Sequence, residues 1–109
     1  MNDKFLSMTG LCKKAGKIVI GTDRVKSTVK NSKVYLVIMA SDTAANTKKD
    51  IIGFCRNFKV NYIEVDYTKE KIGNALGFAE VAFYAVTNKN FTKAIENILR
   101  MTTENGGSL

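Results

Sequence analysis

The fold of this chain is decided by a continuous apolar run, Val34-Tyr35-Leu36-Val37-Ile38-Met39-Ala40. A strand that is apolar at every position is typical of the interior of a sheet that helices cover on both faces. Ser41-Asp42-Thr43 follows directly and supplies side chains suited to a turn and to a helix cap. The run therefore predicts a central strand that leads into a helix.

Helices and strands alternate on both sides of this run. Apolar spacing and capping residues predict helices over 2–14, 22–31, 43–58, 68–77 and from residue 90, with caps at Thr22, Thr68 and Asn90 and a left-handed Gly77. Short apolar or alternating segments predict strands over 17–20, 61–65 and 81–86. This order favours an α/β fold, a three-layer α/β/α sandwich around a mixed sheet of about four strands.

Length and composition limit the class of protein. The chain has 109 residues, 45% of them hydrophobic, which is enough for one core. We expect one domain over residues 1–101 and a flexible tail over 102–109, a polar and glycine-rich segment. No apolar run reaches about 18 residues and no signal-peptide pattern is present, so we expect a cytoplasmic protein.

Several kinds of chemistry are excluded by the absence of histidine. Ser–His–Asp and Cys–His nucleophiles and histidine metal sites are impossible, and two cysteines alone cannot build a zinc site. Cys12 and Cys55 are interpreted as reduced, partly buried residues. We expect no enzyme, no cofactor and no metal. A small hydrolase using Asp42 or Cys12 is only a third hypothesis, because no base partner is visible.

The positive charge is concentrated in the first half of the chain. The net charge is +7, and residues 1–59 carry 12 basic and four acidic side chains, whereas residues 60–109 carry five and six. Such asymmetry indicates one basic face and an anionic partner. A uniformly solvated charged surface is the alternative.

The basic residues cluster in the stretch from Lys13 to Lys26, where a glycine opens a helix. The N-terminus of a helix attracts anions, so this stretch predicts a phosphate site. Gly16 and Gly21 have the spacing of a Walker loop, but Thr22 and Asp23 stand where Lys and Ser or Thr are needed. The stretch therefore favours a nucleic-acid backbone over a nucleotide.

Two features of the sequence suggest how bases are read. Asp23 lies three and four residues before Lys26 and Ser27, so we expect it to pair with them at a helix start that can reach base edges. Phe78 follows a glycine-terminated helix, where it can stack on an unpaired base. The alternatives are ordinary capping with a solvated face for the first feature, and core packing under the loop for Phe78.

Four segments, taken in order, resemble the kink-turn RNA-binding ribosomal-protein superfamily of the L7Ae and L30e type, especially its small bacterial YlxQ-type members. The segments are Lys14–Gly21, Val37–Asp42, Asn61–Val65 and Lys69–Gly77. The resemblance spans roughly residues 5–100, and it rests on the order and spacing of the four segments together. It implies an α/β/α sandwich that binds sharply bent RNA.

The resemblance also implies roles for particular residues. In that family a Gly-x-Asn-Glu-x-x-Lys segment reads tandem sheared G·A pairs, and residues 21–27 match it by position. Asp23, Arg24 and Ser27 stand where the family has asparagine, glutamate and lysine, so the base readout is altered. Lys69 corresponds to a lysine that meets RNA, and the loop over 78–80 to one that covers a splayed-out nucleotide.

We therefore expect a non-catalytic RNA-binding protein of the translation machinery that binds ribosomal or other structured RNA. The alternative is a ribosome-associated protein-interaction module with little RNA specificity. The candidate RNA-binding residues are Lys14, Lys17, Gly21, Thr22, Asp23, Arg24, Lys26, Ser27, Lys30, Lys69, Phe78, Ala79 and Glu80.

Overall fold

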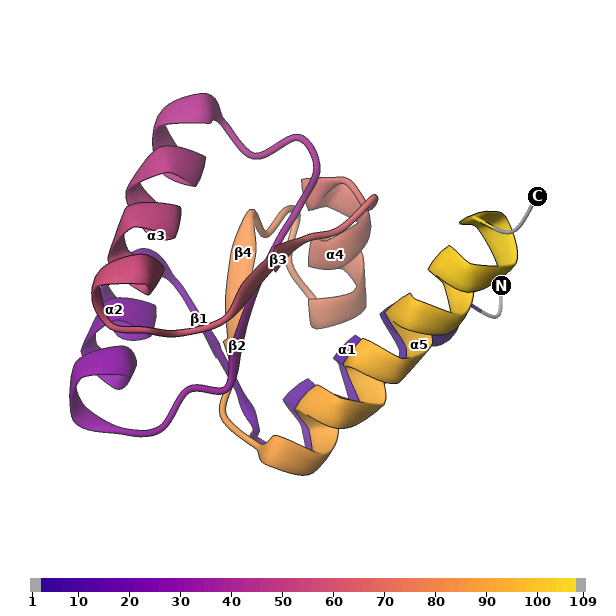
Figure 1. Cartoon of the computed structure of the whole chain (residues 1–109), viewed down its shortest axis with the longest axis horizontal. Coiled ribbons are helices and arrows are strands. Elements are labelled where there is room, and N and C mark those ends of the chain that lie inside the picture. Colours follow the sequence, from indigo (N-terminus) through magenta and orange to yellow (C-terminus); the bar gives the residue numbers. More distant parts are fainter. Residues whose placement is uncertain (1–2, 108–109) are drawn as a thin grey trace.

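The computed structural model describes residues 3–107 and places a sheet between two layers of helices (Figure 1). The helices are α1 (Lys4–Lys14), α2 (Thr22–Asn31), α3 (Ala45–Asn57), α4 (Lys69–Leu76) and α5 (Lys89–Gly107). The strands are β1 (Ile18–Ile20), β2 (Leu36–Met39), β3 (Tyr62–Glu64) and β4 (Phe83–Val86). The α/β/α sandwich that the sequence predicts is confirmed.

The sheet is mixed, and its strand order is β1-β4-β2-β3. β4 pairs antiparallel with both β1 and β2, whereas β2 and β3 are parallel. Val37 of β2 lies opposite Ala85 on one side and Tyr62 on the other. All four residues of β2 are buried, which confirms the central strand expected from the apolar run.

The two faces of the sheet carry separate cores. Alternate residues of a strand point to opposite faces. Leu36 and Ile38 therefore pack in a core with α1, α4 and α5, whereas Val37 and Met39 pack in a core with α2 and α3. In Figure 1 the helices α2 and α3 cover the left of the sheet, and α1, α4 and α5 lie on its right. A chain of this length thus buries both faces of a four-stranded sheet.

Most predicted helix ends are confirmed, but two caps are wrong. The predicted caps of α4 hold, because the Thr68 hydroxyl accepts from the backbone of Lys71 and Gly77 is left-handed. The N-cap of α2 is Gly21, so Thr22 is already helical and makes no cap. The cap of α5 is Asn88, whose Oδ1 accepts from the backbone N–H of Phe91 at 2.9 Å, and not Asn90. Both errors shift a predicted cap by one or two residues along the chain.

Asp42 has a different role from the one that its position suggests. The helix expected from Thr43 begins at Ala45, and it has no side-chain cap. The Asp42 carboxylate instead accepts from the backbone N–H of Lys69 at 2.8 Å. Asp42, which follows β2, therefore stabilises the start of α4 rather than the start of α3.

The chain beyond residue 101 continues α5 as far as Gly107. Of the predicted tail, residues 102–107 are thus helical in backbone, and residues 108–109 lie outside the described residues. The flexibility of this segment and the domain boundary stay predictions. Within residues 3–107, none of the helices combines the length and hydrophobicity that crossing a membrane requires.

Candidate nucleic-acid interface

The loop after α4, residues 77–80, folds back onto its own helix at Gly73. A Cβ at Gly73 would lie 2.5 Å from Cα of Glu80 and 2.9 Å from the carbonyl oxygen of Phe78, so only glycine fits. Gly77, with φ of 83°, turns the chain into the loop. The side chain of Phe78 is 47% exposed, so its interpretation as a core residue under the loop is wrong.

Lys13, in the last turn of α1, connects that helix to the loop. Its Nζ donates to the carbonyl oxygen of Leu76 at 2.8 Å and lies 5.1 Å from the centroid of the Phe78 ring. A cation is favourable at the end of a helix, and it is attracted by an aromatic face. Lys13 was not among the candidate residues, although its place beside Lys14 at a basic helix end is a signal in the sequence.

A groove of about 490 Å³ joins this loop to the start of α2. Its lining consists of Lys13, Ile18, Ile20, Gly21, Arg24 and Phe78. The structure therefore brings Phe78 together with two candidate residues at the start of α2, Gly21 and Arg24, which are more than 50 positions away in the sequence. β1 forms the apolar part of the groove, while Lys13 and Arg24 supply positive charge from two different helices.

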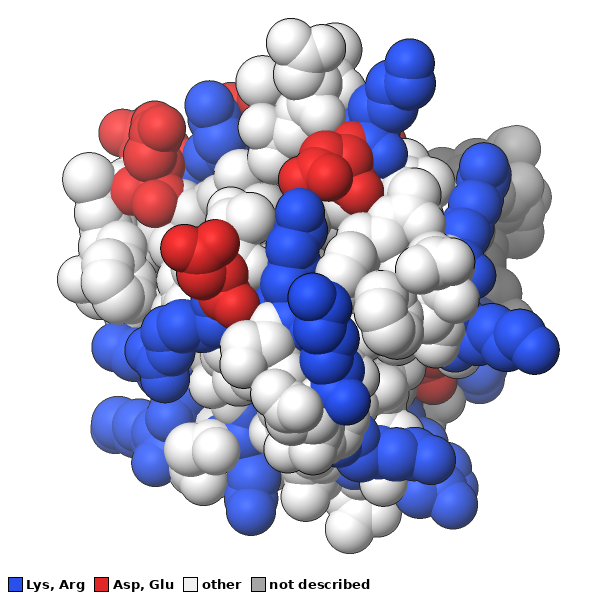
Figure 2. All heavy atoms as spheres, turned by 90° about the vertical axis from the view of Figure 1, so that its left-hand side faces the viewer, with Lys and Arg blue, Asp and Glu red and all other residues white. Residues whose placement is uncertain are grey.

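Several of the candidate cations lie outside the ion pairs of residues 3–101, whose side chains the structure describes. These are Lys14, Lys17, Arg24 and Lys30, and all four are exposed. Figure 2, which looks at the left-hand side of Figure 1, shows Lys and Arg crowded over the lower part of that face and acidic side chains mostly above them. Unpaired cations of this kind attract a polyanion.

Two other candidate lysines are paired with acidic side chains. The spacing predicts that Lys26 pairs with Asp23, but this prediction is wrong. The Nζ of Lys26 lies 3.0 Å from Oδ2 of Asp50 on α3 instead. It also lies 5.4 Å from the centroid of the Phe54 ring, so Lys26 is directed toward α3. Nζ of Lys69 lies 3.7 Å from Oε1 of Glu80. The acidic side chain of the loop is thus partly neutralised by the neighbouring helix.

The remaining candidate residues lie outside the lining of the groove. Ser27 accepts from the side-chain amide of Asn31 at 3.4 Å, on the exposed surface of α2. Thr22, Asp23 and Ala79 are also exposed. They are close in sequence to residues that line the groove, Gly21, Arg24 and Phe78.

The groups that a hydrolase would use are not activated. Burial raises the pKa of the Cys12 thiol to about 11, which reduces its thiolate fraction, and it does the same for Cys55. The Asp42 carboxylate is engaged with the backbone of α4. Within the described residues no three potential metal ligands of the His, Cys, Asp and Glu type lie together.

The chain is similar to two bacterial proteins, each named RNA-binding protein YlxQ. The one from Bacillus subtilis (strain 168) is 28% identical over 96 residues, which cover 88% of this chain and 95% of the relative. The one from Enterococcus faecium is 26% identical over 96 residues, which cover 88% of this chain and 91% of the relative. Both similarities extend over nearly the whole length of the relatives.

Solved structures share the fold. A protein of unknown function from Bacillus halodurans C has a TM-score of 0.82 and 27% identity, over 91% of this chain and 99% of its own. The Giardia lamblia 15.5kD RNA binding protein has a TM-score of 0.68 at 17% identity, over 93% of this chain and 89% of its own. At that identity the second likeness shows the fold alone.

A family model accounts for the same elements. The model described as Ribosomal protein L7Ae/L30e/S12e/Gadd45 family matches residues 3–96, a range that runs from the cap of α1 into α5. The range contains the whole groove and every candidate residue. The order of the elements, the solved fold and this match agree, and the chain belongs to the ribosomal protein L7Ae/L30e/S12e/Gadd45 family.

Proposed function

We propose that the chain is a non-catalytic RNA-binding protein of the translation machinery, which works in the cytoplasm on structured RNA, including kink-turn-like RNA. The observation that carries the proposal is the groove in which Arg24 and Gly21, at the start of α2, meet Phe78 of the loop after α4. The names of the two YlxQ relatives and the family membership support it.

The groove and its surroundings offer what a sharply bent RNA needs. A bend brings phosphates together, and a protein stabilises it by supplying cations and by binding the bent form alone. Lys14, Lys17 and Arg24 are exposed cations outside any ion pair within residues 3–101. The exposed ring of Phe78 suits stacking on a base that leaves the helix.

The base readout is proposed to be relaxed relative to the family motif. Ionised Asp23 accepts hydrogen bonds but donates none, whereas an asparagine at this place does both. Lys26, the nearest substitute for the lysine of the motif, is held by Asp50. Arg24 is left as a donor toward phosphate or a guanine edge in the groove. We expect the protein to prefer bent RNA while tolerating changes in the sheared G·A pairs.

Fluorescence anisotropy with a labelled kink-turn stem-loop, and with the same RNA carrying G·C in place of the sheared pairs, tests the function. Four phosphate contacts predict that the affinity falls roughly 100-fold between about 50 and 200 mM salt. We expect both RNAs to bind, the kink-turn more tightly. Absence of binding to either RNA at low salt would contradict the proposal and favour a protein-interaction module.

A further inference from the structure

A second hollow lies beside the groove, between α1 and α4. This α1–α4 cleft has a volume of about 840 Å³ and is lined by five residues of α1, from Ser7 to Lys14, and by residues 74–77 at the end of α4. Its volume falls within the range of about 300–1,000 Å³ typical of small-molecule and cofactor sites. None of the candidate residues except Lys14 lies in it.

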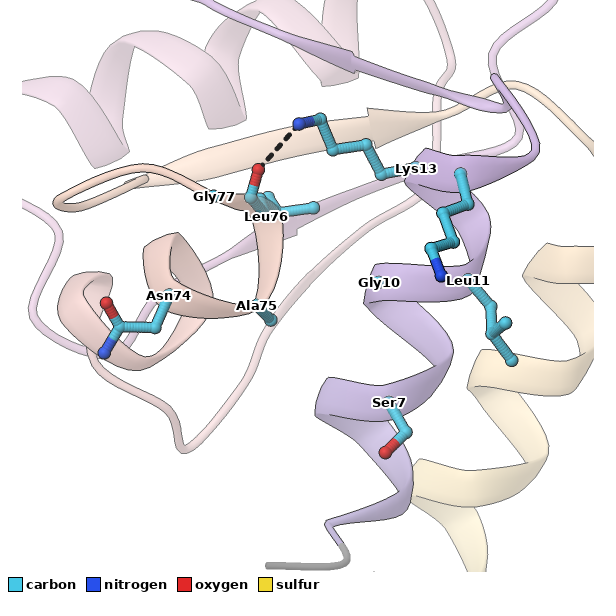
Figure 3. A pocket seen from close by; sticks show the side chains of 9 residues that line it. Ser7, Gly10, Leu11, Lys13, Asn74, Ala75, Leu76 and Gly77 are labelled. Carbon is cyan, nitrogen blue, oxygen red and sulfur yellow. Dashed lines mark hydrogen bonds between the residues drawn. The ribbon is translucent and has the colours of Figure 1, made fainter.

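Small residues set the depth of the cleft. The two helices approach closely at Gly10, where a Cβ would lie 3.4 Å from the carbonyl oxygen of Ala75. Figure 3 shows α1 and α4 side by side, with Leu11 and Asn74 on the two outer sides and Lys13 bridging the helices at one end. The space between the helices is thus lined by small, mostly apolar residues, and the longer side chains of Leu11, Lys13 and Asn74 stand at its edges.

The chemistry of the rims fits a nucleotide. Lys13 and Lys14 stand at one end, and no acidic residue lines the cleft. Leu11 is 53% exposed, so its apolar side chain offers a surface that the face of a base can cover. The exposed Asn74 amide has both donors and an acceptor for a base edge.

The cleft adjoins the groove of the proposed RNA site. Lys13 lines both hollows, and Gly77 of the cleft is followed directly by Phe78 of the groove. We propose that the α1–α4 cleft is a second RNA subsite, which takes one or two nucleotides of a single-stranded segment that flanks the structured RNA. The proposal rests on the proposed function of the groove.

Two RNAs test the subsite: the stem-loop used above, and the same stem-loop with about ten adenosines added at each end. The extension is expected to raise the affinity of the wild-type protein about tenfold, the effect of stacking one base. Leu11→Glu should remove this gain. Met101→Glu is the matched control, because the substitution introduces the same charge. Met101 is 51% exposed on α5 and does not line either hollow.

A second pair of variants guards against a folding defect in Leu11→Glu. Asn74→Glu should also remove the gain, whereas Asn46→Glu, at an exposed position on α3, should keep it. In amide NMR spectra, the added shifts caused by the extension should fall at Gly10, Ala75 and Gly77. Circular dichroism of each variant confirms that it is folded.

The results separate the two proposals. If the stem-loop binds but the extension adds no affinity, or if Met101→Glu loses the gain as fully as Leu11→Glu, the subsite is refuted while the groove stands. Extension shifts at residues outside the cleft refute it equally. If neither RNA binds, the function proposed for the groove fails, and the subsite fails with it.

Discussion

The start of α2 and the loop after α4 line the same groove, but each depends on glycine for a different reason. Gly21 has φ of 104°, which L side chains rarely adopt, although a Cβ there would meet nothing within 4 Å. Gly73 lies inside a helix, but its Cβ would lie 2.5 Å from Cα of Glu80. Gly21 is required by its backbone conformation, and Gly73 is required because no space is left for a side chain. The start of α2 is thus exposed around Gly21 and Arg24, whereas the loop is held against its helix at Gly73.

Gly73→Ala should have the largest effect on this comparison. Alanine favours a helix by about 1 kcal/mol over glycine. Here the new Cβ meets backbone atoms, which cannot move aside as a flexible side chain does. Overpacking of this kind costs about 1–3 kcal/mol or more, so we expect a net loss of about 2 kcal/mol in the free energy of unfolding. Urea denaturation measures it.

The control for this variant is Gly53→Ala in α3. A Cβ at Gly53 would meet nothing within 4 Å, so only the gain in helix propensity remains, about 0.5–1 kcal/mol. Gly73→Ala should also weaken RNA binding, because the loop that presents Phe78 must shift. Equal stability of the two variants would show that the loop yields easily and that its fixed shape is not required.

Reversing the charge of two exposed cations, Lys17 just before β1 and Arg24 in the first turn of α2, should give the next largest effect. Lys17→Glu combined with Arg24→Glu should lower RNA affinity about 30-fold and make the salt dependence shallower by about 1.5 in log–log slope. Both side chains are exposed and outside any ion pair in the described chain, so stability should not change. Lys49→Glu with Lys93→Glu, two exposed lysines of α3 and α5, carries the same charge change as a control.

The sequence was sufficient to predict the features that depend on local pattern. The apolar run from Val34 predicts β2. Gly77 predicts the end of α4, because the preference of glycine for a left-handed conformation does not depend on the rest of the fold. The position of Phe78 beside α2 depends on tertiary packing, and only the family resemblance anticipated it. Local reasoning assigned Lys26 to Asp23 on its own helix, whereas its partner Asp50 lies 24 residues away on α3. Lys13 lies in the predicted phosphate-binding stretch, but its hydrogen bond to Leu76, 63 residues away, likewise depends on tertiary packing.

Lys13→Met should have a smaller effect, and it tests whether the loop is held from α1. The substitution removes the hydrogen bond to the Leu76 carbonyl and the cation above the Phe78 ring, which together are worth about 1 kcal/mol of stability. RNA affinity should fall about fivefold, because a mobile Phe78 must be ordered on binding. Lys13→Arg should restore part of both quantities.

Lys14→Met is the matched control for Lys13→Met. It removes the same charge from the same helix end, but the hydrogen bond to Leu76 and the contact with the Phe78 ring belong to Lys13 and not to Lys14. Its stability should therefore equal that of the wild type, while its affinity for RNA falls only through the lost charge. If Lys13→Met and Lys14→Met behaved alike in urea denaturation, Lys13 would act as a charge alone and not as a support for the loop.

The smallest effect is expected at Lys26. Its comparison with Lys30 separates the cations of α2 that are held in an ion pair from those that are not. The pair with Asp50 is partly exposed, so Lys26→Gln should cost less than about 1 kcal/mol of stability. Lys30→Gln removes the same charge one turn further along, at a lysine that forms no ion pair within residues 3–101. Lys30→Gln should lower the salt slope by about 0.7–0.9, and Lys26→Gln should leave it unchanged. The opposite order would mean that RNA displaces Asp50 and that Lys26 substitutes for the lysine of the family motif.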